Sequence, residues 1–186
     1  TQTGLERFGC VWWKLWVTEE KCAKRGLKPG DLGPGSYGAA WRAFPTSEGL
    51  PFDQITHLVE QIKELPHLRT HFVSPWIPQY IGRGKDKQQK VVVAPCHGWL
   101  HVFVDTQRKE LLLHHFQRSA DVPVGLAFNL IQYAALTLML GQVTGYKLGN
   151  RWGIVNLKKE FITNAEFEGL LYTGGDRIIA FKKLAP

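Results

Sequence analysis

The sequence is poor in cysteine and has no uninterrupted apolar run of membrane-spanning length. Its three cysteines, Cys10, Cys22 and Cys96, form no Cys-x-x-Cys pair. An odd count of this kind argues against a secreted disulfide scaffold and predicts a reducing, cytoplasmic location. The first ten residues lack the apolar core of a signal peptide. The longest apolar stretch, residues 122–140, predicts a buried helix and not a membrane span, because it is interrupted at Gly125, Asn129, Gln132 and Thr137.

Two kinds of binding motif are also absent. The chain has no Gly-x-Gly-x-x-Gly or P-loop sequence, so a bound nucleotide would have to be held by side chains. The histidines lack metal-ligand spacing. His114 and His115 are adjacent on a predicted strand and point to opposite faces, while His97 and His101 are four residues apart outside a helix. We therefore expect no metal site.

What the chain does have is a globular composition with an excess of positive charge. Its 186 residues are 44% apolar and 21% charged, and the net charge is +7. At about 150 residues per domain, this length predicts a single domain over residues 1–186. The positive charge suits an anionic ligand, whether nucleic acid, an acidic membrane or a phosphorylated small molecule, and it does not choose among them.

Hydrophobic periodicity predicts two helices and several strands. Asp53–Leu65 has the pattern of an amphipathic helix that Asp53 caps and Pro66 ends, and a second helix is expected over about residues 124–140. The Gly- and Pro-rich run 28–36 predicts a structured loop. Because the strands follow one another along the chain, the pattern indicates an α+β fold and not a doubly wound sheet. The predicted strands are Thr70–Trp76, Val91–Ala94, Trp99–Val104, Glu110–Phe116, Phe161–Leu171 and Ile178–Lys182, with a hairpin turn at Asp105–Lys109.

Cys96, in the segment 94–98, is the candidate nucleophile. A cysteine with the ordinary pKa of about 8.5 is mostly protonated near neutral pH, so a nucleophilic thiolate needs a nearby cation. Arg118 is the candidate cation, and with Gln117 and Ser119 it offers guanidinium, amide and hydroxyl donors for a phosphate. Two ordinary alternatives stay open. Cys96 is also compatible with a small buried hydrophobe, and Arg118 with a turn-shaping ion pair to Asp121.

The second predicted helix carries an amide that needs a partner. Asn129 lies among apolar residues, and a buried amide without hydrogen bonds is costly. It shares a helix face with Gly125 and Tyr133, because the three are spaced by four residues. An amide donates and accepts at once, as the N3–H and O4 edge of uracil requires, and the alternative is a core amide bonded to the backbone. Of the seven tryptophans, most are expected in the core and some could stack on a flat heterocycle.

Several motifs resemble the thymidylate synthase family, which includes the pyrimidine nucleotide hydroxymethylases. Ala94–His97 resembles the family's nucleophile motif, and Gln117–Asp121 resembles its Gln-Arg-Ser-x-Asp motif. Gly125–Tyr133 resembles its Gly-x-Pro-Phe-Asn-Ile-x-x-Tyr helix, and the similarity runs from about Trp12 to Gly149. Further matches are Trp13 and Trp16, the run Gly30–Pro34, and Tyr37, Gly38, Trp41 and Arg42.

The resemblance implies a fold and a reaction. The expected fold is α+β and thymidylate synthase-like, a mixed β-sheet packed with helices that include a long buried helix, and dimerising through the sheet. The expected reaction transfers a one-carbon unit from 5,10-methylenetetrahydrofolate to C5 of a pyrimidine nucleoside monophosphate, after Cys96 adds to C6. The cofactor carries the carbon, and the protein positions and activates.

The resemblance also implies roles for individual residues. Arg118 would hold the phosphate and favour the Cys96 thiolate, and Tyr37 would assist the chemistry near Cys96. The expected catalytic residues are Cys96, Arg118, Tyr37, Asp121 and Asn129. The expected substrate-binding residues are Arg69, His97, Gln117, Ser119, Asp121 and Asn129, and those expected to border the folate are Trp13, Trp16, Asp121 and Gly125.

The chain departs from the family pattern at several positions. Arg69 matches the first of two arginines that reach a phosphate across the family's homodimer interface, but the second position holds Thr70. Lys85, Lys87 or Lys90 could supply the missing charge. Ala127 replaces the usual proline. The family's Gly-Asp-x-His-x-Tyr segment, its N-terminal phosphate-loop arginine and its base-polarising glutamate have no clear match. We therefore expect residues 1–186 to lack the family's N-terminal and late segments.

These departures from the family pattern determine how we rank the candidate functions. Thr70 and Ala127 favour hydroxymethylation of a dUMP- or CMP-type substrate, and Asn129 favours uracil. Ordinary thymidylate synthase, making dTMP from dUMP, is the first alternative, and a non-catalytic nucleotide-binding relative is the second. A basic nucleic-acid-binding module using Gly82–Lys90 ranks last, because no reading motif supports it. We expect a homodimer, with neither a membrane nor a nucleic acid as a required partner.

Overall fold

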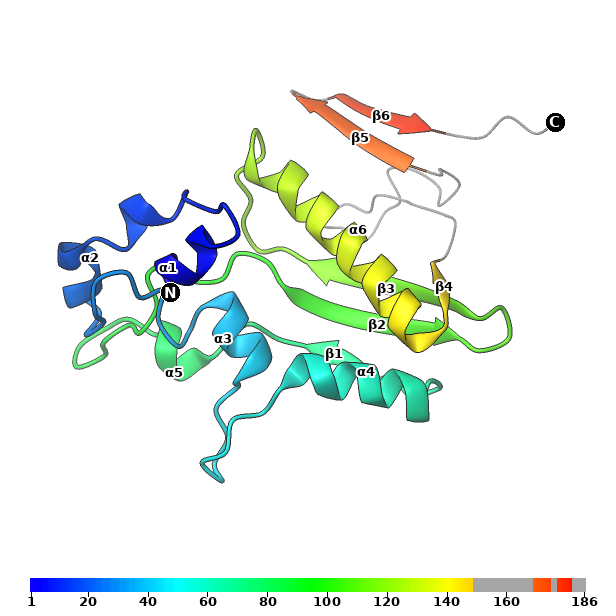
Figure 1. The fold of residues 1–186 in the computed structure, drawn as a ribbon, viewed down its shortest axis with the longest axis horizontal. Coiled ribbons are helices and arrows are strands. Elements are labelled where there is room, and N and C mark those ends of the chain that lie inside the picture. The colour runs from blue at the N-terminus through cyan, green and yellow to red at the C-terminus, as the bar shows by residue number, and fades with distance from the viewer. Residues whose placement is uncertain (149–168, 175–176, 182–186) are drawn as a thin grey trace. The chain divides into compact units, whose positions relative to one another are not determined.

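The computed structural model describes residues 1–148, 169–174 and 177–181 (Figure 1). The chain divides into two compact units. The first comprises Thr1–Phe103 and Leu113–Ser119, and the second comprises Val104–Leu112 and Ala120–Pro186. A single domain was predicted over residues 1–186. We describe each unit by itself.

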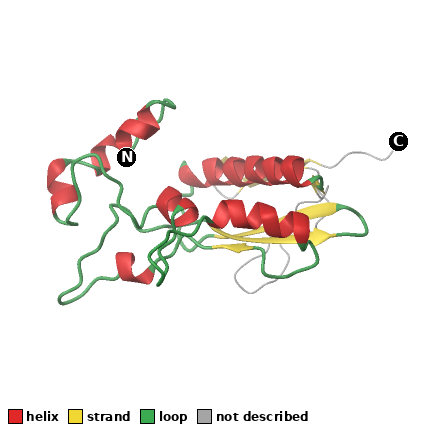
Figure 2. Cartoon of the chain, turned by 60° about the horizontal axis from the view of Figure 1, so that its bottom comes forward, coloured by secondary structure: helices red, strands yellow, loops and turns green. Residues whose placement is uncertain are grey.

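The first unit contains the amphipathic helix that the sequence predicts. Helix α4 spans Gln54–Glu64, and the Asp53 carboxylate accepts hydrogen bonds from the N–H groups of Ile55 and Thr56 at 3.1 and 3.0 Å. This N-cap satisfies backbone donors that the first helical turn leaves free. Leu58 and Ile62 are buried on the inner face, and α4 packs against strand β1 (Figure 2).

Short helices make up much of the rest of the first unit. Each is six residues or fewer, too short for an apolar repeat to show in the sequence, and the sequence predicted none of them. They are α1 (Gln2–Glu6), the 3₁₀ turn η1 (Lys14–Trp16), α2 (Glu19–Ala23), α3 (Tyr37–Arg42) and α5 (Pro78–Ile81).

The predicted loop over residues 28–36 is confirmed as ordered structure. Gly33 has a φ of +90°, and a Cβ there would lie 2.4 Å from the carbonyl oxygen of Lys90. The Gly35 N–H donates to the same oxygen at 3.2 Å. Only glycine permits both this conformation and this approach, so the loop is pinned against residue 90.

The sheet has the strand order β1-β2-β3-β4. Strand β1 (Phe72–Val73) is antiparallel to β2 (Trp99–Asp105), with Phe72 opposite His101. Strand β3 (Glu110–Phe116) is parallel to β4 (Lys147–Leu148), so the sheet is mixed, as expected. The predicted hairpin turn is confirmed, because Asp105 Oδ1 accepts the N–H groups of the two residues that follow Thr106, at 3.0 and 2.9 Å.

Two strand predictions were wrong in whole or in part. Of residues 70–76 only Phe72–Val73 is a strand, because the Ser74 N–H donates to the Gln54 side chain at 3.0 Å and Pro75 has no N–H. Residues 91–94 form no strand. The Val92 N–H donates to the Leu32 carbonyl at 3.1 Å, so this apolar segment is buried against the 28–36 loop and not in the sheet.

The second unit contains helix α6, Gly125–Thr144, which confirms the predicted second helix and extends it. Gly145 ends it in a left-handed conformation with φ +79°. The buried residues of α6 are Tyr133, Thr137, Leu140 and Gly141, while several apolar side chains such as Ile131 and Met139 are exposed. The all-round burial expected of this helix is therefore not found. By length and composition α6 would also pass for a membrane span.

Two antiparallel strands close the described part of the second unit. Strand β5 (Gly169–Gly174) pairs with β6 (Arg177–Phe181). Strand β6 confirms the strand predicted at residues 178–182, shifted by one residue. The other prediction covered residues 161–171, of which 161–168 lie outside the described residues.

Candidate active site

Cys96 lies in the loop that leads into β2, and its side chain is partly buried. The thiol donates to the Ala94 carbonyl oxygen at 3.6 Å. Two residues on, Gly98 has a φ of +97°, a left-handed turn that glycine adopts without strain. Strand β2 begins at Trp99, three residues after the cysteine, so the sulfur lies in the loop just before the strand.

Arg118 follows the end of β3 and is fixed against the Cys96 loop. Its backbone N–H donates to the Cys96 carbonyl at 2.9 Å, and its Nε donates to the Pro95 carbonyl at 2.7 Å. Its Nη2 lies 3.3 Å from the Ala94 carbonyl and 3.8 Å from Cys96 Sγ. The predicted meeting of thiol and guanidinium is therefore confirmed, and among the described residues the guanidinium bonds to carbonyls and contacts the sulfur, with no carboxylate partner.

The Arg118 guanidinium keeps free donors. Its Cζ lies 5.5 Å from the centre of the Trp76 ring, so the cation also rests on an aromatic face. Arginine has five N–H donors, and both on Nη1 have no partner among the described residues. Since the side chain is exposed, these two donors can form a bidentate pair with a phosphate.

Tyr37, the first residue of α3, supports the cysteine from the other side. Its phenol oxygen accepts the Cys96 N–H at 2.7 Å, and its ring stacks on His97 with centroids 4.3 Å apart. Burial raises the pKa of Tyr37 above its ordinary value, although the hydrogen bond from Cys96 opposes this. The phenol is therefore protonated at neutral pH and can donate a proton or a hydrogen bond near the sulfur.

His115 is a site residue that the sequence analysis considered only as a metal ligand. It accepts the Gly98 N–H at Nε2, at 3.2 Å, so the proton of the neutral ring is on Nδ1. Its ring lies 6.1 Å from that of His97. Strand alternation did predict that His114 and His115 face opposite sides, and His114 is exposed and contacts Phe103.

Both histidines of this site are neutral at physiological pH. Burial lowers the pKa of His97 to about 4. Burial, followed by the proximity of His97, lowers the pKa of His115 to about 4. A neutral His97 adds no positive charge beside Cys96, so Arg118 is the cation that contacts the sulfur.

The other predicted substrate-binding residues of the first unit are near the surface. The Gln117 amide donates to the Ser119 carbonyl at 3.1 Å, and Ser119 is exposed directly after Arg118. Arg69 is exposed next to β1, and its carbonyl oxygen lies 2.9 Å from His101 Nε2. Its expected role at the phosphate site of a partner subunit stays a prediction.

The residues expected to border the folate are divided between the units. In the first unit Trp13 is partly buried, and Trp16 is 50% exposed with Lys21 Nζ 5.0 Å from its ring centre. In the second unit, the Asp121 carbonyl accepts the Leu126 N–H at 2.9 Å, and a Cβ at Gly125 would lie 3.2 Å from Asp121 Cβ.

Asn129 also belongs to the second unit, on α6, and is partly buried. The expected roles of Asp121, Gly125 and Asn129 toward Cys96 stay predictions. Within the described residues, no group of three histidine, cysteine or acidic side chains could hold a metal ion.

A thiol in the loop before β2, contacted by a guanidinium with free donors and adjoined by a phenol, is an arrangement that can pair a nucleophile with an anion-binding group. The comparison of the whole sequence with known families identifies the class of protein. The thymidylate synthase family model matches residues 2–158, and the chain belongs to the thymidylate synthase family. Members of this family are transferases that modify pyrimidine nucleotides at C5 with a folate.

Proposed function

We propose that this chain transfers a one-carbon unit to C5 of a pyrimidine nucleoside monophosphate, with Cys96 as the nucleophile. The observation that carries the proposal is the 3.8 Å contact between Arg118 Nη2 and Cys96 Sγ. The same guanidinium contacts the sulfur and, through its Nη1, can bind the phosphate of the substrate.

The chemistry begins with addition of the Cys96 thiolate to C6. The thiolate lone pair forms the new S–C6 bond and displaces the π electrons of the C5–C6 double bond toward C5 and the O4 side of the ring, so C5 becomes nucleophilic. C5 would then bond to the one-carbon unit, the bond between that carbon and the folate nitrogen would break, and in hydroxymethylation water would supply the hydroxyl group. Loss of the C5 proton and expulsion of the Cys96 thiolate restore the double bond and free the enzyme.

The residues around Cys96 divide the remaining tasks. Arg118 orients the sulfur and the phosphate together, because its guanidinium is fixed by two carbonyls. Tyr37 holds the Cys96 backbone and, as a neutral phenol, can donate to developing charge. Neutral His97 packs against Tyr37 and keeps this ring in place.

The folate fits the first unit at the tryptophans. Trp16 presents a half-exposed indole face, which suits stacking on a flat pterin. The folate supplies a one-carbon unit at the oxidation level of formaldehyde. Trp13 and Trp16 would hold its ring system.

Within this reaction we favour hydroxymethylation over methylation. Support comes from Thr70, which replaces a phosphate-binding arginine, and from Ala127, which replaces the usual proline of α6. Both mark a divergent member of the family. Asn129 favours uracil as the base, because an amide matches its N3–H and O4 edge.

A product assay distinguishes the candidates. The protein is incubated with 5,10-methylenetetrahydrofolate and, separately, with dUMP, UMP, dCMP and CMP. A nucleotide product heavier by CH₂O, without dihydrofolate, is expected. Dihydrofolate with a methylated product would identify a thymidylate synthase. Nucleotide binding without release of the C5 hydrogen would identify a non-catalytic relative.

Cysteine variants test the nucleophile. Cys96→Ala is expected to abolish both product formation and C5 hydrogen release. Cys10→Ala is the matched control, because Cys10 is also free and partly buried, and it should retain wild-type activity. Persistent turnover in Cys96→Ala would remove Cys96 from the mechanism.

We also propose a homodimer through the sheet. A row of aromatic rings crosses three strands, with neighbouring ring centroids 4.1 to 5.7 Å apart at Phe72, His101, Phe103 and His114, and the two end rings of the row are exposed. Phe72 is 52% exposed, and a second copy would cover it. Light scattering should give a dimer that Phe72→Ser weakens and Leu50→Ser, at another exposed apolar residue, leaves intact. A monomeric wild-type chain would contradict this.

A further inference from the structure

A second cationic cluster lies in the first unit, where the end of α2 meets the loop 82–90. It surrounds a pocket of about 470 Å³ that is open to solvent. Figure 1 draws α2 and this loop next to one another. None of the lining residues belongs to the proposed active site. They are Lys24, Arg25, Arg83, Lys87, Gln88 and Gln89, with no acidic residue among them.

Close backbone packing holds the two walls of this pocket together. Gly26 has a φ of +63°, and a Cβ there would lie 2.7 Å from Gln88 Oε1, so the glutamine lies directly against the turn after α2. The loop is anchored at its end by Lys90, whose N–H donates to the Tyr80 carbonyl at 2.8 Å. The Lys90 carbonyl accepts the Gly35 N–H. The pocket is thus built by ordered backbone on both sides.

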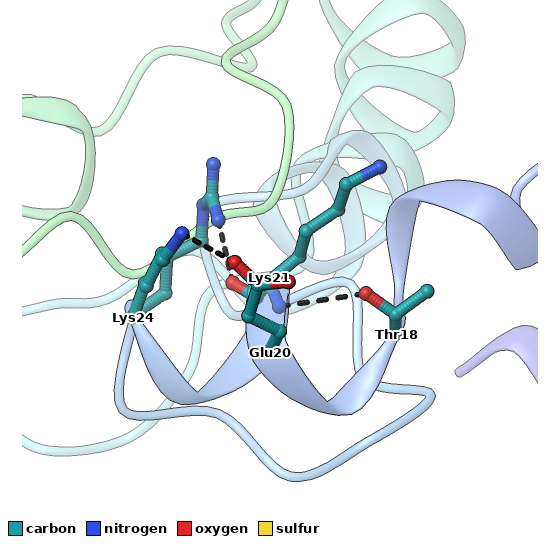
Figure 3. Close-up of polar contacts among 5 residues, drawn as sticks. Thr18, Glu20, Lys21 and Lys24 are labelled. Atoms are coloured by element: carbon teal, nitrogen blue, oxygen red, sulfur yellow. Dashed lines mark hydrogen bonds and ion pairs between the residues drawn. The ribbon is translucent and has the colours of Figure 1, made fainter.

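On the α2 side, the cations are held in place. Lys24 Nζ pairs with Glu20 Oε1 at 2.6 Å, and Thr18 caps the start of the helix (Figure 3). Arg25 Nη1 donates to the Lys21 carbonyl at 2.5 Å. The buried Arg25 Nε has no acceptor among the described residues. Glu20 therefore offsets one charge and leaves Arg25 uncompensated.

On the loop side, the donors lack partners. Arg83 and Lys87 are exposed and, within the described part of the chain, make no ion pair or side-chain hydrogen bond. Gln89 is only 9% exposed, and its buried Nε2 has no acceptor among those residues. Asp86 belongs to the same loop but does not line the pocket.

Without a ligand, two buried donors of this pocket, Arg25 Nε and Gln89 Nε2, have no acceptor among the described residues. Like charges in one pocket repel, and a buried amide donor without an acceptor loses its hydrogen bond to water. An anion with several oxygens would remove the repulsion and supply the acceptors that Arg25 and Gln89 lack. Arginine forks match phosphate oxygens in particular.

We propose that this pocket binds a diphosphate or triphosphate group, either as inorganic pyrophosphate or as part of a nucleotide. Each phosphate carries between about one and two negative charges near neutral pH, so a diphosphate balances the three cations that Glu20 leaves uncompensated. The pocket is also of the size usual for small-ligand sites. The inference is independent of the proposed function.

Calorimetry at one fixed ionic strength tests the proposal. Pyrophosphate should bind the wild-type chain one to one, with a dissociation constant on the order of 10–100 μM. A nucleoside triphosphate arm distinguishes the two sources, because tighter binding of the nucleotide shows that its base or sugar is also recognised. Cys96→Ala and Arg118→Lys should bind pyrophosphate as the wild type does, which separates this pocket from the active site.

Charge variants of the loop give the matched control. Lys87→Gln should weaken pyrophosphate binding at least tenfold, whereas Lys85→Gln, in the same loop but outside the pocket, should change it less than twofold. Thermal melting checks that both variants fold. The proposal is overturned by equal losses in the two variants, by equally tight binding of citrate, or by an absence of pyrophosphate binding below millimolar concentration. It is also overturned if a long oligonucleotide binds and pyrophosphate does not.

Discussion

Arg118 and the two loop cations of the second pocket differ in how firmly they are held. Arg118 bonds to two carbonyls, contacts a sulfur and rests on Trp76. Arg83 and Lys87 have no such partners among the described residues. A fixed guanidinium can stabilise charge at one atom without reorganising, whereas mobile cations attract an anion and adapt to it. Firm anchoring therefore suits chemistry, and loose anchoring suits binding.

The largest expected effect is on Arg118. Arg118→Lys keeps the charge but loses the fork that joins Pro95, Ala94 and Cys96. We expect kcat/KM to fall roughly a hundredfold or more, with pyrophosphate binding at the second pocket unchanged. Steady-state kinetics with saturating folate measure this. If the lysine variant keeps activity within threefold, anchoring is not what distinguishes the two sites.

A smaller effect is expected at Tyr37. Tyr37→Phe removes the acceptor of the Cys96 N–H, which costs about 1–3 kcal/mol for a group left unpaired. We expect a roughly tenfold loss in kcat with little change in KM, because the cysteine is displaced and the phosphate site is not. Tyr80→Phe is the control, since the described residues show no hydrogen bond from its hydroxyl. Equal kinetics in the two variants would show that Tyr37 does not hold the Cys96 backbone in place.

The smallest effect is a pH dependence of stability at His115. The pKa of His115 is about 4 in the folded chain and 6.5 in the unfolded chain. Between these pH values the unfolded state therefore binds more protons than the folded state. Stability should therefore fall as pH drops from about 6.5 to about 4, and His97 contributes in the same direction. Urea unfolding at pH 7 and pH 5 should show a smaller fall in His115→Gln than in the wild type.

The exposed His67 provides the control for this measurement. His67→Gln should show the same fall in stability as the wild type. If His115→Gln behaves in the same way as His67→Gln, the burial of His115 does not contribute to the pH dependence.

The elements that could be predicted are those whose signals are local. Asp53 caps α4 through residues two and three positions away, and Asp105 closes the β2–β3 turn in the same way. The apolar segment 91–94 was predicted as a strand because apolar β-branched residues favour strands. Its backbone instead bonds to the Leu32 carbonyl, which lies about 60 residues earlier and leaves no local sign.

The candidate site shows the same division. The family motifs identified Cys96, Arg118 and Tyr37, and the structure brings these three together. His115 and Trp76 were missed as site residues. Strand alternation gives the face on which His115 lies, but its bond to Gly98 depends on how the Cys96 loop folds back on β3.

By itself, the sequence determined the family and the order of the motifs along the chain, including the candidate nucleophile Cys96, because these depend on residue types and their spacing. The tertiary structure alone decided which donors of Arg118 stay free, and that cations from residues 24–25 and 83–87 surround one pocket. The reason is physical. Side chains 22 residues apart, as in the Cys96–Arg118 pair, or nearly 60 apart, as in the pocket, meet only after the intervening backbone has satisfied its own hydrogen bonds and burial.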